Sequence, residues 1–277
     1  MTDRYAVIGN PIAHSRSPRI HALFAAQTGQ DIAYGAILAP LDGFAAAVRK
    51  FIAEGGRGAN VTVPFKEEAH RLAAALSPRA RGAGAVNTLD FSGPAIFGDN
   101  TDGAGLVRDL TANLDCPISA RRVLLLGAGG AARGALLPLL QESPAALVIA
   151  NRSADKARRL AREFSAADAA APLEGCGFAD LAGRQFDLVI DATSAGLSDA
   201  PLELPPGLFA PGGFAYEMVY GRQTAFQRLA RAGGAVRVAD GLGMLVEQAA
   251  ESFLLWRGVR PQTGPVLAQL RRELVRP

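Results

Sequence analysis

The sequence predicts an α/β fold with a doubly wound parallel sheet in the middle of the chain. From Arg122 onward, short apolar runs alternate with helical patterns, which is typical of parallel sheets built from β-α-β units. A glycine-rich turn joins the first of these runs, Val123 to Leu126, to the helix that follows. With 277 residues, the chain can form two modest domains or one large one.

The glycine-rich turn is a candidate phosphate site. The preceding run is uninterrupted and apolar, as expected for a strand that is buried on both faces. Gly127 allows a tight turn and Gly129 lets backbone approach a pyrophosphate, while Gly130 and Ala131 allow the helix to pack closely. The N–H groups at the helix start favour an anion. Because the third glycine of the usual fingerprint is missing, an ordinary strand-to-helix loop is the alternative.

The end of the next strand indicates the cofactor. The strand-like run Ala146 to Ala150 ends in Asn151, Arg152 and Ser153. Dinucleotide-binding folds place the ribose-binding group there, an acid for NAD or an arginine for the 2′-phosphate of NADP. The acid is missing and Arg152 is present, so NADP is the preferred cofactor. The alternative is a solvated surface arginine.

Composition argues against several classes of protein. The net charge is +3 and the pI about 9.1, but no basic block with interleaved aromatic residues is present, which argues against nucleic-acid binding. No apolar run approaches the ~20 residues needed to cross a bilayer, and no signal peptide is visible. Cys116 and Cys176 are isolated in loop-like segments, which suggests a reducing cytoplasm. His14, His21 and His70 lack metal-site spacing and are expected to be packing or surface residues.

The first 113 residues also alternate between strands and helices. Ser17 precedes Pro18 and is expected to cap the first helix. Ser15 and Ser17 alternate on this turn, where hydroxyls and free N–H groups could hold a carboxylate. Strands are expected at 5–8, 32–38, 58–63, 85–91 and 95–97, and helices at 18–27, 41–54, 65–76 and 103–113.

Lys66 stands where a lysine is unfavourable. It falls in the first turn of a predicted helix, beside Pro64, and the positive end of the helix dipole disfavours a cation there. Such local conflicts tend to mark functional sites, and a lysine can transfer protons. A plain surface lysine is the alternative.

The polar turn at 98–103, GDNTDG, follows the first half of the chain. Asp102 is expected to cap the next helix. Asp99, Asn100 and Thr101 add acceptors and hydroxyls at the junction of the two halves of the chain, where a cleft is expected.

In the second half of the chain, two further sets of candidate residues stand out in addition to the glycine turn. Met218 and Tyr220 are expected on the same side of a strand by its period of two. Gln248 lies one turn from Met244 on an apolar helix face, so it needs a buried backbone group or a ligand hydroxyl as partner. Strands are expected at 123–126, 146–150, 186–191, 213–220 and 235–238, helices at 129–140, 154–164, 224–232, 240–256 and 264–276, and a loop or marginal helix at 165–183.

Taken together, eight motifs resemble those of shikimate dehydrogenases from end to end of the chain. In order, they are GNPIAHSRSP, GANVTVPFKE, GAVNT, GDNTDG, LLLGAGGAARG, NRS, DATSAG and DGLGMLVEQA. One such string would be weak, but eight in order with similar spacing are highly specific.

The resemblance implies a two-domain α/β protein with its active site in the cleft between the domains. Residues 1–102 with 241–277 would form the substrate-binding and catalytic domain, and residues 103–240 a Rossmann-type NADP domain. The implied reaction is the reversible, NADP-dependent reduction of 3-dehydroshikimate to shikimate, in chorismate and aromatic amino-acid biosynthesis.

The resemblance also implies residue roles. Lys66 matches the proton-transfer residue, which Asp102 assists. Ser15, Ser17 and Tyr220 match positions that hold the substrate carboxylate. Thr62, Asn87, Asp102 and Gln248 match positions that hold its hydroxyls. The matched cofactor contacts are Gly127, Ala128, Gly129, Gly130, Ala131, Asn151, Arg152, Ser153, Lys156, Met218 and Gly241.

Three positions depart from the family pattern. The segment after Tyr220 is one residue shorter than in many relatives and has Ala225 where a proline is common. Pro78 stands where some relatives carry an acid. Lys156 occupies a position that is often arginine, which keeps the charge but loses bidentate geometry.

Two other functions remain open from the sequence. One is a quinate/shikimate dehydrogenase of broader cofactor use, against which Arg152 argues. The other is a non-catalytic nucleotide-binding regulator, which loss of Lys66 or Asp102 would mark, and both are present. We expect a small-molecule substrate, no resident metal, no membrane partner, and a monomer or homodimer.

Overall fold

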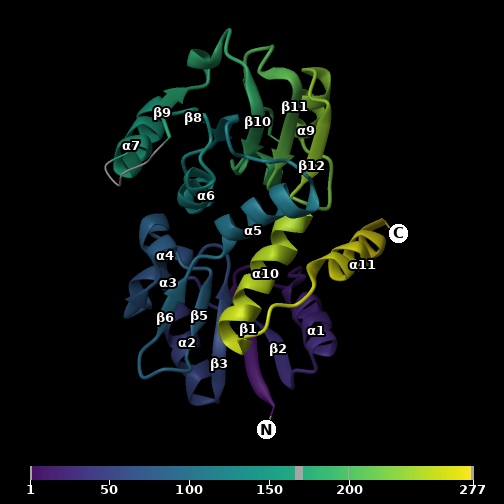
Figure 1. Cartoon of the computed structure of the whole chain (residues 1–277). Coiled ribbons are helices and arrows are strands. Elements are labelled where there is room, and N and C mark those ends of the chain that lie inside the picture. The colour runs from purple at the N-terminus through teal and green to yellow at the C-terminus, as the bar shows by residue number, and fades with distance from the viewer. Residues whose placement is uncertain (1, 166–170, 199, 276–277) are drawn as a thin grey trace. The chain divides into compact units, whose positions relative to one another are not determined.

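The computed structural model describes residues 2–165, 171–198 and 200–275. The chain divides into two compact units, residues 1–105 with 245–277 (unit 1) and residues 106–244 (unit 2). Each unit contains a six-stranded sheet flanked by helices (Figure 1). The α/β class predicted from the sequence is therefore confirmed.

Unit 2 contains a fully parallel, doubly wound sheet. Its strand order is β12-β11-β10-β7-β8-β9, so the chain starts in the middle and winds outward in both directions. Ligands of such sheets bind at the carboxyl ends of the central strands, where the winding direction changes. The strands are β7 (Arg122–Leu126), β8 (Ala146–Asn151), β9 (Leu173–Gly177), β10 (Phe186–Asp191), β11 (Phe209–Glu217) and β12 (Arg237–Asp240).

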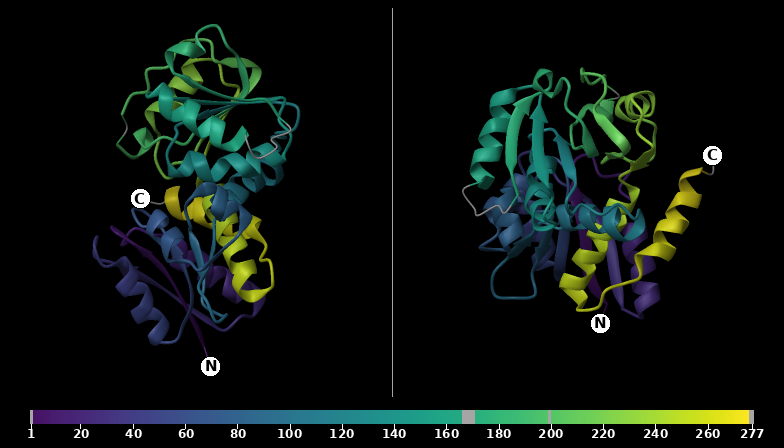
Figure 2. Two further views of the ribbon diagram at one scale, coloured as in Figure 1. Left: turned by 90° about the vertical axis from the view of Figure 1, so that its left-hand side faces the viewer. Right: turned by 45° about the horizontal axis from the view of Figure 1, so that its top comes forward.

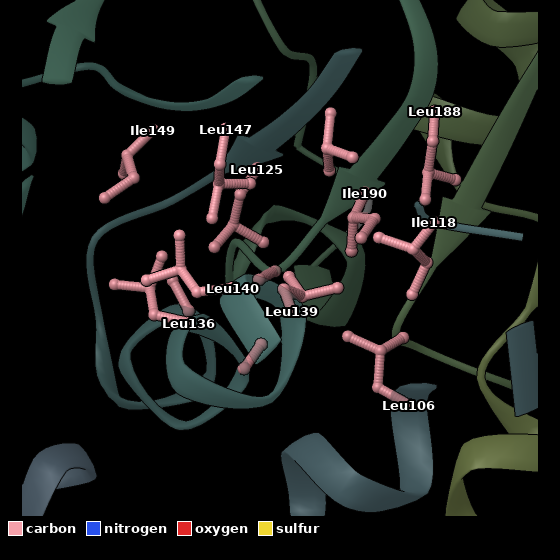
Figure 3. Packing of buried hydrophobic residues seen from close by; sticks show 14 of the residues in the cluster. Leu106, Ile118, Leu125, Leu136, Leu139, Leu140, Leu147, Ile149, Leu188 and Ile190 are labelled. Carbon is pink, nitrogen blue, oxygen red and sulfur yellow. The ribbon is translucent and has the colours of Figure 1, made fainter. Parts of the chain in front are cut away.

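Helices cover both faces of this sheet (Figure 2). Leu125 and Ile190 face α6 and pack with Leu136 and Leu139 (Figure 3). On the opposite face, Leu124 and its neighbours pack against α9. Successive strand residues point to opposite faces, which is why the whole run 123–126 is apolar. The helical elements are η1 (a π-helix, Asp109–Asn113), α6 (Gly130–Gln141), α7 (Ala154–Ser165), η2 (a 3₁₀ helix, Ala179–Leu181), α8 (Ala195–Ser198) and α9 (Ala225–Ala232).

Unit 1 has a mixed sheet in the order β2-β1-β3-β5-β6-β4. β1, β2 and β3 are parallel, and β5 runs antiparallel to both β3 and β6. The strands are β1 (Asp3–Gly9), β2 (Ile32–Leu38), β3 (Gly56–Val61), β4 (Ala75–Leu76), β5 (Thr88–Asp90) and β6 (Phe97–Asp99). The helices are α1 (Ser17–Thr28), α2 (Phe44–Ala53), α3 (Lys66–Leu72), α4 (Pro78–Ala83), α5 (Asp102–Arg108, which continues into unit 2), α10 (Leu242–Arg257, which begins there) and α11 (Thr263–Val275).

Three predicted elements were wrong. The helix expected over 65–76 ends at Leu72, because residues 75–76 pair with β6 as strand β4 instead. The loop or marginal helix expected over 165–183 contains strand β9, which adds to the edge of the sheet beside β8, and Cys176 therefore lies in a strand; residues 166–170 lie outside the described residues. The strand expected over 213–220 ends at Glu217, so Met218 and Tyr220 lie in the following loop and have no strand alternation.

Candidate functional site

Lys66 and Asp102 form an ion pair in unit 1. Lys66 is the first residue of α3, and its Nζ lies 2.6 Å from Oδ2 of Asp102. The side chains are 31% and 16% exposed, so the pair is sheltered but accessible. The carboxylate compensates the unfavourable position of a cation at a helix N-terminus. The pair can hold or move a proton at Nζ, as an acid–base group requires.

The predicted capping role of Asp102 was wrong. Asp102 is the first residue of α5, and its oxygens accept from side chains: Oδ2 from Lys66, and Oδ1 from the Asn87 amide at 2.8 Å. The backbone N–H of Asp102 donates instead to Oδ1 of Asn100, at 3.2 Å. The carboxylate is thus directed at Lys66 rather than at its own helix.

Asn87 joins this pair to the buried interior. Its Oδ1 accepts from the backbone N–H of Thr101 at 2.8 Å and from the Thr88 hydroxyl at 2.9 Å. Since these donors fix the oxygen side of the amide, Nδ2 must face Asp102. Nδ2 also lies 3.3 Å from Oε1 of Gln248. Asn87 is only 2% exposed, so its orientation is set by protein groups.

Gln248 reaches this group from the far end of the sequence, on α10. Its Nε2 donates to the carbonyl of Leu245 at 2.8 Å, which supplies the backbone partner expected for a glutamine on an apolar face. One turn further, the hydroxyl of Ser252 lies 2.8 Å from that of Thr88 and accepts from Nδ2 of Asn60 at 2.9 Å.

The polar network continues to Tyr34. The Tyr34 hydroxyl donates to Oδ1 of Asn60 at 2.7 Å, and its ring stacks on His21 at 4.1 Å. Burial lowers the pKa of His21 to about 3, so this histidine is a neutral packing residue. Sequence analysis did not single out Asn60, Ser252 or Tyr34, because their partners lie up to 192 residues away.

Ser15 and Ser17 lie at the start of α1, but Ser17 is not the cap. The helix begins at Ser17, and Arg16, in the cap position, makes no capping bond with its side chain. Ser15 takes over part of that role, because its hydroxyl accepts from the Ser17 N–H at 3.3 Å. Hydroxyls beside the positive end of a twelve-residue helix suit an anionic group.

Thr62 directly follows β3 in the turn that leads to Lys66. Its carbonyl accepts from the Phe65 N–H at 3.0 Å, and its own N–H donates to Ile8 at 3.0 Å. The residue is half-buried. Unit 1 therefore brings together Lys66, Asn87, Asp102 and Gln248 by direct contact, whereas Thr62 is tied to the group through the backbone of its turn.

In unit 2, the glycine turn leaves the start of α6 open. Gly127 has φ +105°, and a Cβ there would lie 3.1 Å from the Ala192 carbonyl, so this turn requires glycine. The N-cap of α6 is Gly129, which has no side chain to cap the first N–H groups of the helix. Gly129, Gly130 and Ala131 are exposed, and a Cβ at either glycine would meet open space. These features fit a dinucleotide phosphate.

A hollow of about 340 Å³ lies next to the strands that flank β7. Asn151 and Arg152, at the end of β8, line it. Thr193 and Ser194, after β10, contribute hydroxyls. Among the described residues, the lining does not include Ser153 or Lys156. Both are exposed: Ser153 follows Arg152, and Lys156 lies in the first turn of α7. Sequence analysis missed the remaining lining residues, which come from α8 and from loops: Phe178, Ala195, Ser198, Ala200, Pro201, Leu202 and Glu203.

Met218, Tyr220 and Gly241 form a second group in unit 2. Met218 and Tyr220 are half-buried in the loop after β11. A Cβ on Gly241 would lie 2.0 Å from the Met218 carbonyl oxygen, so Gly241 must be glycine to let these backbones approach. This contact gives Gly241 a packing reason that is independent of any cofactor.

Two buried carboxylates near this loop were not foreseen. Asp191 and Glu217 end β10 and β11, are paired in register and have no solvent exposure. Burial raises the pKa of Asp191 to about 6 and, together with the Asp191 charge, that of Glu217 to about 7. Among the described residues, Oδ2 of Asp191 has no hydrogen-bond partner. Their apolar flanks made both residues read as ordinary strand ends.

The described part of the chain offers neither a cluster of metal ligands nor a membrane-spanning helix. It contains no group of three or more His, Cys, Asp or Glu side chains arranged to hold a metal. None of the helices within residues 2–165, 171–198 and 200–275 combines the length and apolar character that crossing a bilayer requires.

Three family models match the chain. They describe a shikimate dehydrogenase substrate binding domain (residues 7–89), a shikimate/quinate 5-dehydrogenase (residues 110–198) and a shikimate 5′-dehydrogenase C-terminal domain (residues 241–271). A shikimate dehydrogenase (NADP(+)) of Dechloromonas aromatica is 66% identical over 276 residues, which cover 99% of this chain and all of the relative. The chain belongs to the shikimate dehydrogenase family.

Solved structures agree with this membership. An Ael1 enzyme from Pseudomonas putida has a TM-score of 0.92 at 51% identity, over 97% of this chain and 98% of that one. Shikimate 5-dehydrogenase from Thermus thermophilus, in complex with NADP(H) and shikimate, has a TM-score of 0.84 at 34% identity, over 98% and 99% of the two chains. The family resemblance read from the eight motifs is therefore confirmed.

Proposed function

We propose that this chain catalyses the reversible, NADP-dependent reduction of 3-dehydroshikimate to shikimate. Family membership at 66% identity over the whole chain supports the reaction class. The observation that carries the proposal is the Lys66–Asp102 contact at 2.6 Å, because it places a proton-transfer group within a site of amide and hydroxyl groups.

Unit 1 would bind the substrate. Lys66 donates a proton to the carbonyl oxygen in reduction and accepts the alcohol proton in oxidation, while Asp102 holds its Nζ. Asn87, Gln248 and Thr62 would bind the ring hydroxyls. Ser15 and Ser17 at the start of α1, together with Tyr220 of unit 2, would bind the carboxylate. These contacts act by orientation, since they fix the reacting carbon relative to the hydride donor.

Unit 2 would bind NADP, which supplies or accepts the hydride when bound. The open start of α6, from Gly127 to Ala131, would bind the pyrophosphate. Arg152, assisted by Asn151, Ser153 and Lys156, would bind the 2′-phosphate. Met218 would give the nicotinamide an apolar wall, and Gly241 would also contact the cofactor. The two free, buried cysteines agree with a reducing compartment, and we place the enzyme in the cytoplasm.

The test is a spectrophotometric assay of shikimate oxidation with NADP and with NAD, repeated with quinate and with Lys66→Met. We expect NADP-linked oxidation of shikimate, and a kcat lowered by about 10²–10⁴ in the variant, because general acid–base catalysis contributes that much. The KM for shikimate should stay within a few-fold. Lys50→Met is the matched control, since the Lys50 side chain is 79% exposed on α2 and its loss should change neither constant.

Each other outcome has a definite meaning. Preferred turnover of quinate with NAD would replace the proposed reaction by that of a broader quinate/shikimate dehydrogenase. No turnover with any pair would refute an enzymatic role. Full activity of Lys66→Met would remove Lys66 from the mechanism while leaving the reaction itself standing.

A further inference from the structure

The loop between β11 and α9, residues 218–223, carries Met218 and Tyr220 and is bonded at both ends by one buried side chain. Glu217 immediately precedes the loop. Its Oε1 accepts from the Val219 N–H at 2.9 Å, and its Oε2 accepts from the Thr224 hydroxyl at 2.6 Å. A single carboxylate therefore connects the first turn of the loop to the residue that ends it.

The far end of this connection is rigid. Thr224 is the N-cap of α9, where its hydroxyl accepts from the Gln227 N–H and the Gln227 side chain accepts from the Thr224 N–H. Thr224 and Glu217 both have no solvent exposure. The bond between Glu217 and Thr224 thus fixes the loop against a capped helix rather than against another loop.

The near end is enclosed on two sides. A Cβ on Gly196 of α8 would lie 3.1 Å from both Glu217 oxygens and 2.9 Å from the Val219 side chain. Arg222, within the loop, donates to the Gly196 carbonyl. On the other side, Gly241 packs against the Met218 carbonyl, and its N–H donates to Val219 at 3.3 Å. Gly196 therefore lies against the Glu217 carboxylate, and Gly241 against the backbone at the start of the loop.

We propose that Glu217 is the positioning residue of this loop, and that by binding both ends it holds Tyr220 and Met218 in the conformation that binds the substrate carboxylate and the cofactor. This inference rests on the proposed function, from which the roles of Tyr220 and Met218 come. The carboxyl group suits the task because each of its two oxygens bonds a different end of the loop. A glutamine can reproduce the geometry by accepting from Val219 and donating to the Thr224 oxygen.

The experiment compares Glu217→Ala and Glu217→Gln with the wild-type enzyme. In Glu217→Ala, the KM for shikimate should rise about tenfold or more, because both ends of the loop are released. The Kd for NADP, measured by fluorescence titration, should stay within about twofold, since the proposed phosphate contacts at α6 and Arg152 are untouched. Glu217→Gln should recover most of the lost affinity for shikimate.

Asp187→Ala is the matched control. Asp187 is another acid of the same sheet that accepts from a backbone N–H, that of Arg122 at 2.8 Å, but it lies at the start of β10. Its loss should loosen the sheet without changing the KM for shikimate. A rise of the KM in this control as large as in Glu217→Ala would reduce the role of Glu217 to general stability and overturn the proposal.

A second readout needs no activity. Hydrogen exchange of the amides of residues 218–223 should become about tenfold faster in Glu217→Ala and remain near the wild-type rate in Glu217→Gln. Unchanged exchange in Glu217→Ala, an unchanged KM, or a loss of affinity for NADP larger than that for shikimate would each overturn the positioning role. If the wild-type enzyme does not oxidise shikimate, the proposed function fails, and the exchange rates still decide whether Glu217 holds the loop.

Discussion

Unit 1 pairs the buried carboxylate of Asp99 with a cation, whereas the hydrogen bonds to the buried Asp191 and Glu217 of unit 2 come from neutral donors. In unit 1, Asp99 binds the Arg79 guanidinium through both oxygens, at 2.8 and 2.6 Å. Burial opposes ionisation of Asp99, but the bonds and the charge of Arg79 outweigh it and lower its pKa. In unit 2, Asp191 accepts from the Thr193 N–H and Glu217 from an amide and a hydroxyl, so burial prevails and raises both pKa values.

Because of this difference, a change of pH alters the contributions of these carboxylates to stability in opposite directions in the two units. A carboxylate with a lowered pKa stabilises the fold above its unfolded value of about 3.8, and this contribution is lost as the pH falls through the folded pKa. A carboxylate with a raised pKa contributes to stability at low pH instead. The contributions of Asp191 and Glu217 are complete below pH ~4 and decline as the pH rises through about 6 and 7.

The largest effect should come from removing the cation of unit 1. Arg79→Met would leave Asp99 buried without its charge partner, which typically costs about 3–5 kcal/mol. Denaturant unfolding, monitored through hydrogen exchange of the unit 1 amides, measures this cost. Adding Asp99→Asn should recover part of it, because no unpaired charge then remains. Arg71→Met, at an exposed position on α3, is the control. A loss below about 1 kcal/mol would show that the pair is not needed.

Replacing a buried acid of unit 2 by a neutral residue should have the opposite effect on stability, with a gain at high pH. Asp191→Asn keeps an oxygen for the Thr193 N–H and removes a buried charge whose raised pKa corresponds to about 3 kcal/mol. We expect a gain of about 2–3 kcal/mol at pH 8 and almost none at pH 4. Exchange of the β10 and β11 amides at both pH values reports it. Asp155→Asn, whose side chain is 92% exposed, should show neither effect; a less stable Asp191→Asn at pH 8 would contradict the comparison.

Arg152, one of the exposed cations of unit 2, should act on a ligand rather than on the fold. Arg152→Gln should lower kcat/KM for NADP by about 10–100-fold, because it removes a bidentate phosphate contact, and leave that for NAD within a few-fold. Stability should not change. Arg158→Gln, which removes an exposed arginine paired with Asp155 and Asp180, is the matched control. Equal losses with NADP and NAD would refute the phosphate-binding role.

The smallest effect concerns the neutral part of the unit 1 network. Ser252→Ala removes a hydroxyl that contacts Asn60 and Thr88, and should destabilise unit 1 by about 1–2 kcal/mol. Ser165→Ala is a close match, because each hydroxyl also donates to the carbonyl four residues earlier, at 3.1 Å and 2.9 Å. The difference between the two thermal shifts measures the network alone. Equal shifts would show that the network adds nothing beyond that local bond.

Local patterns in the sequence were sufficient for the centre of the doubly wound unit. The apolar run before Gly127 and the alternation after it predicted β7, α6, β8, α7 and β10 within about a residue at each boundary. Arg152 at the end of β8 followed from the same pattern, since the spacing from the glycines is set by one helix and one strand. In each case the signal lies within about thirty residues of the feature that it predicts.

Partners that are distant in the sequence were decided only by the tertiary structure. Pairing with β6 turned residues 75–76 into a strand within a helical pattern, and pairing with β8 recruited β9 from small residues. The start of α1 is a local exception, because the hydroxyl that accepts from the Ser17 N–H belongs to Ser15, only two residues earlier.

The candidate site divides in the same way. Lys66 stood out by its conflict with the helix dipole, but only the fold brings Asp102, 36 residues away, and Gln248, on the last long helix but one, into the same hydrogen-bonded group. Glu217 gave no signal at all, because a strand-end glutamate is unremarkable until its neighbours are known. The sequence by itself predicted the residues proposed to carry the chemistry and determined most of the strands and helices, since both follow from local physical chemistry. Sheet order and register decided which side chains share a proton, a hydrogen bond or a buried charge, since those depend on distances that no local pattern encodes.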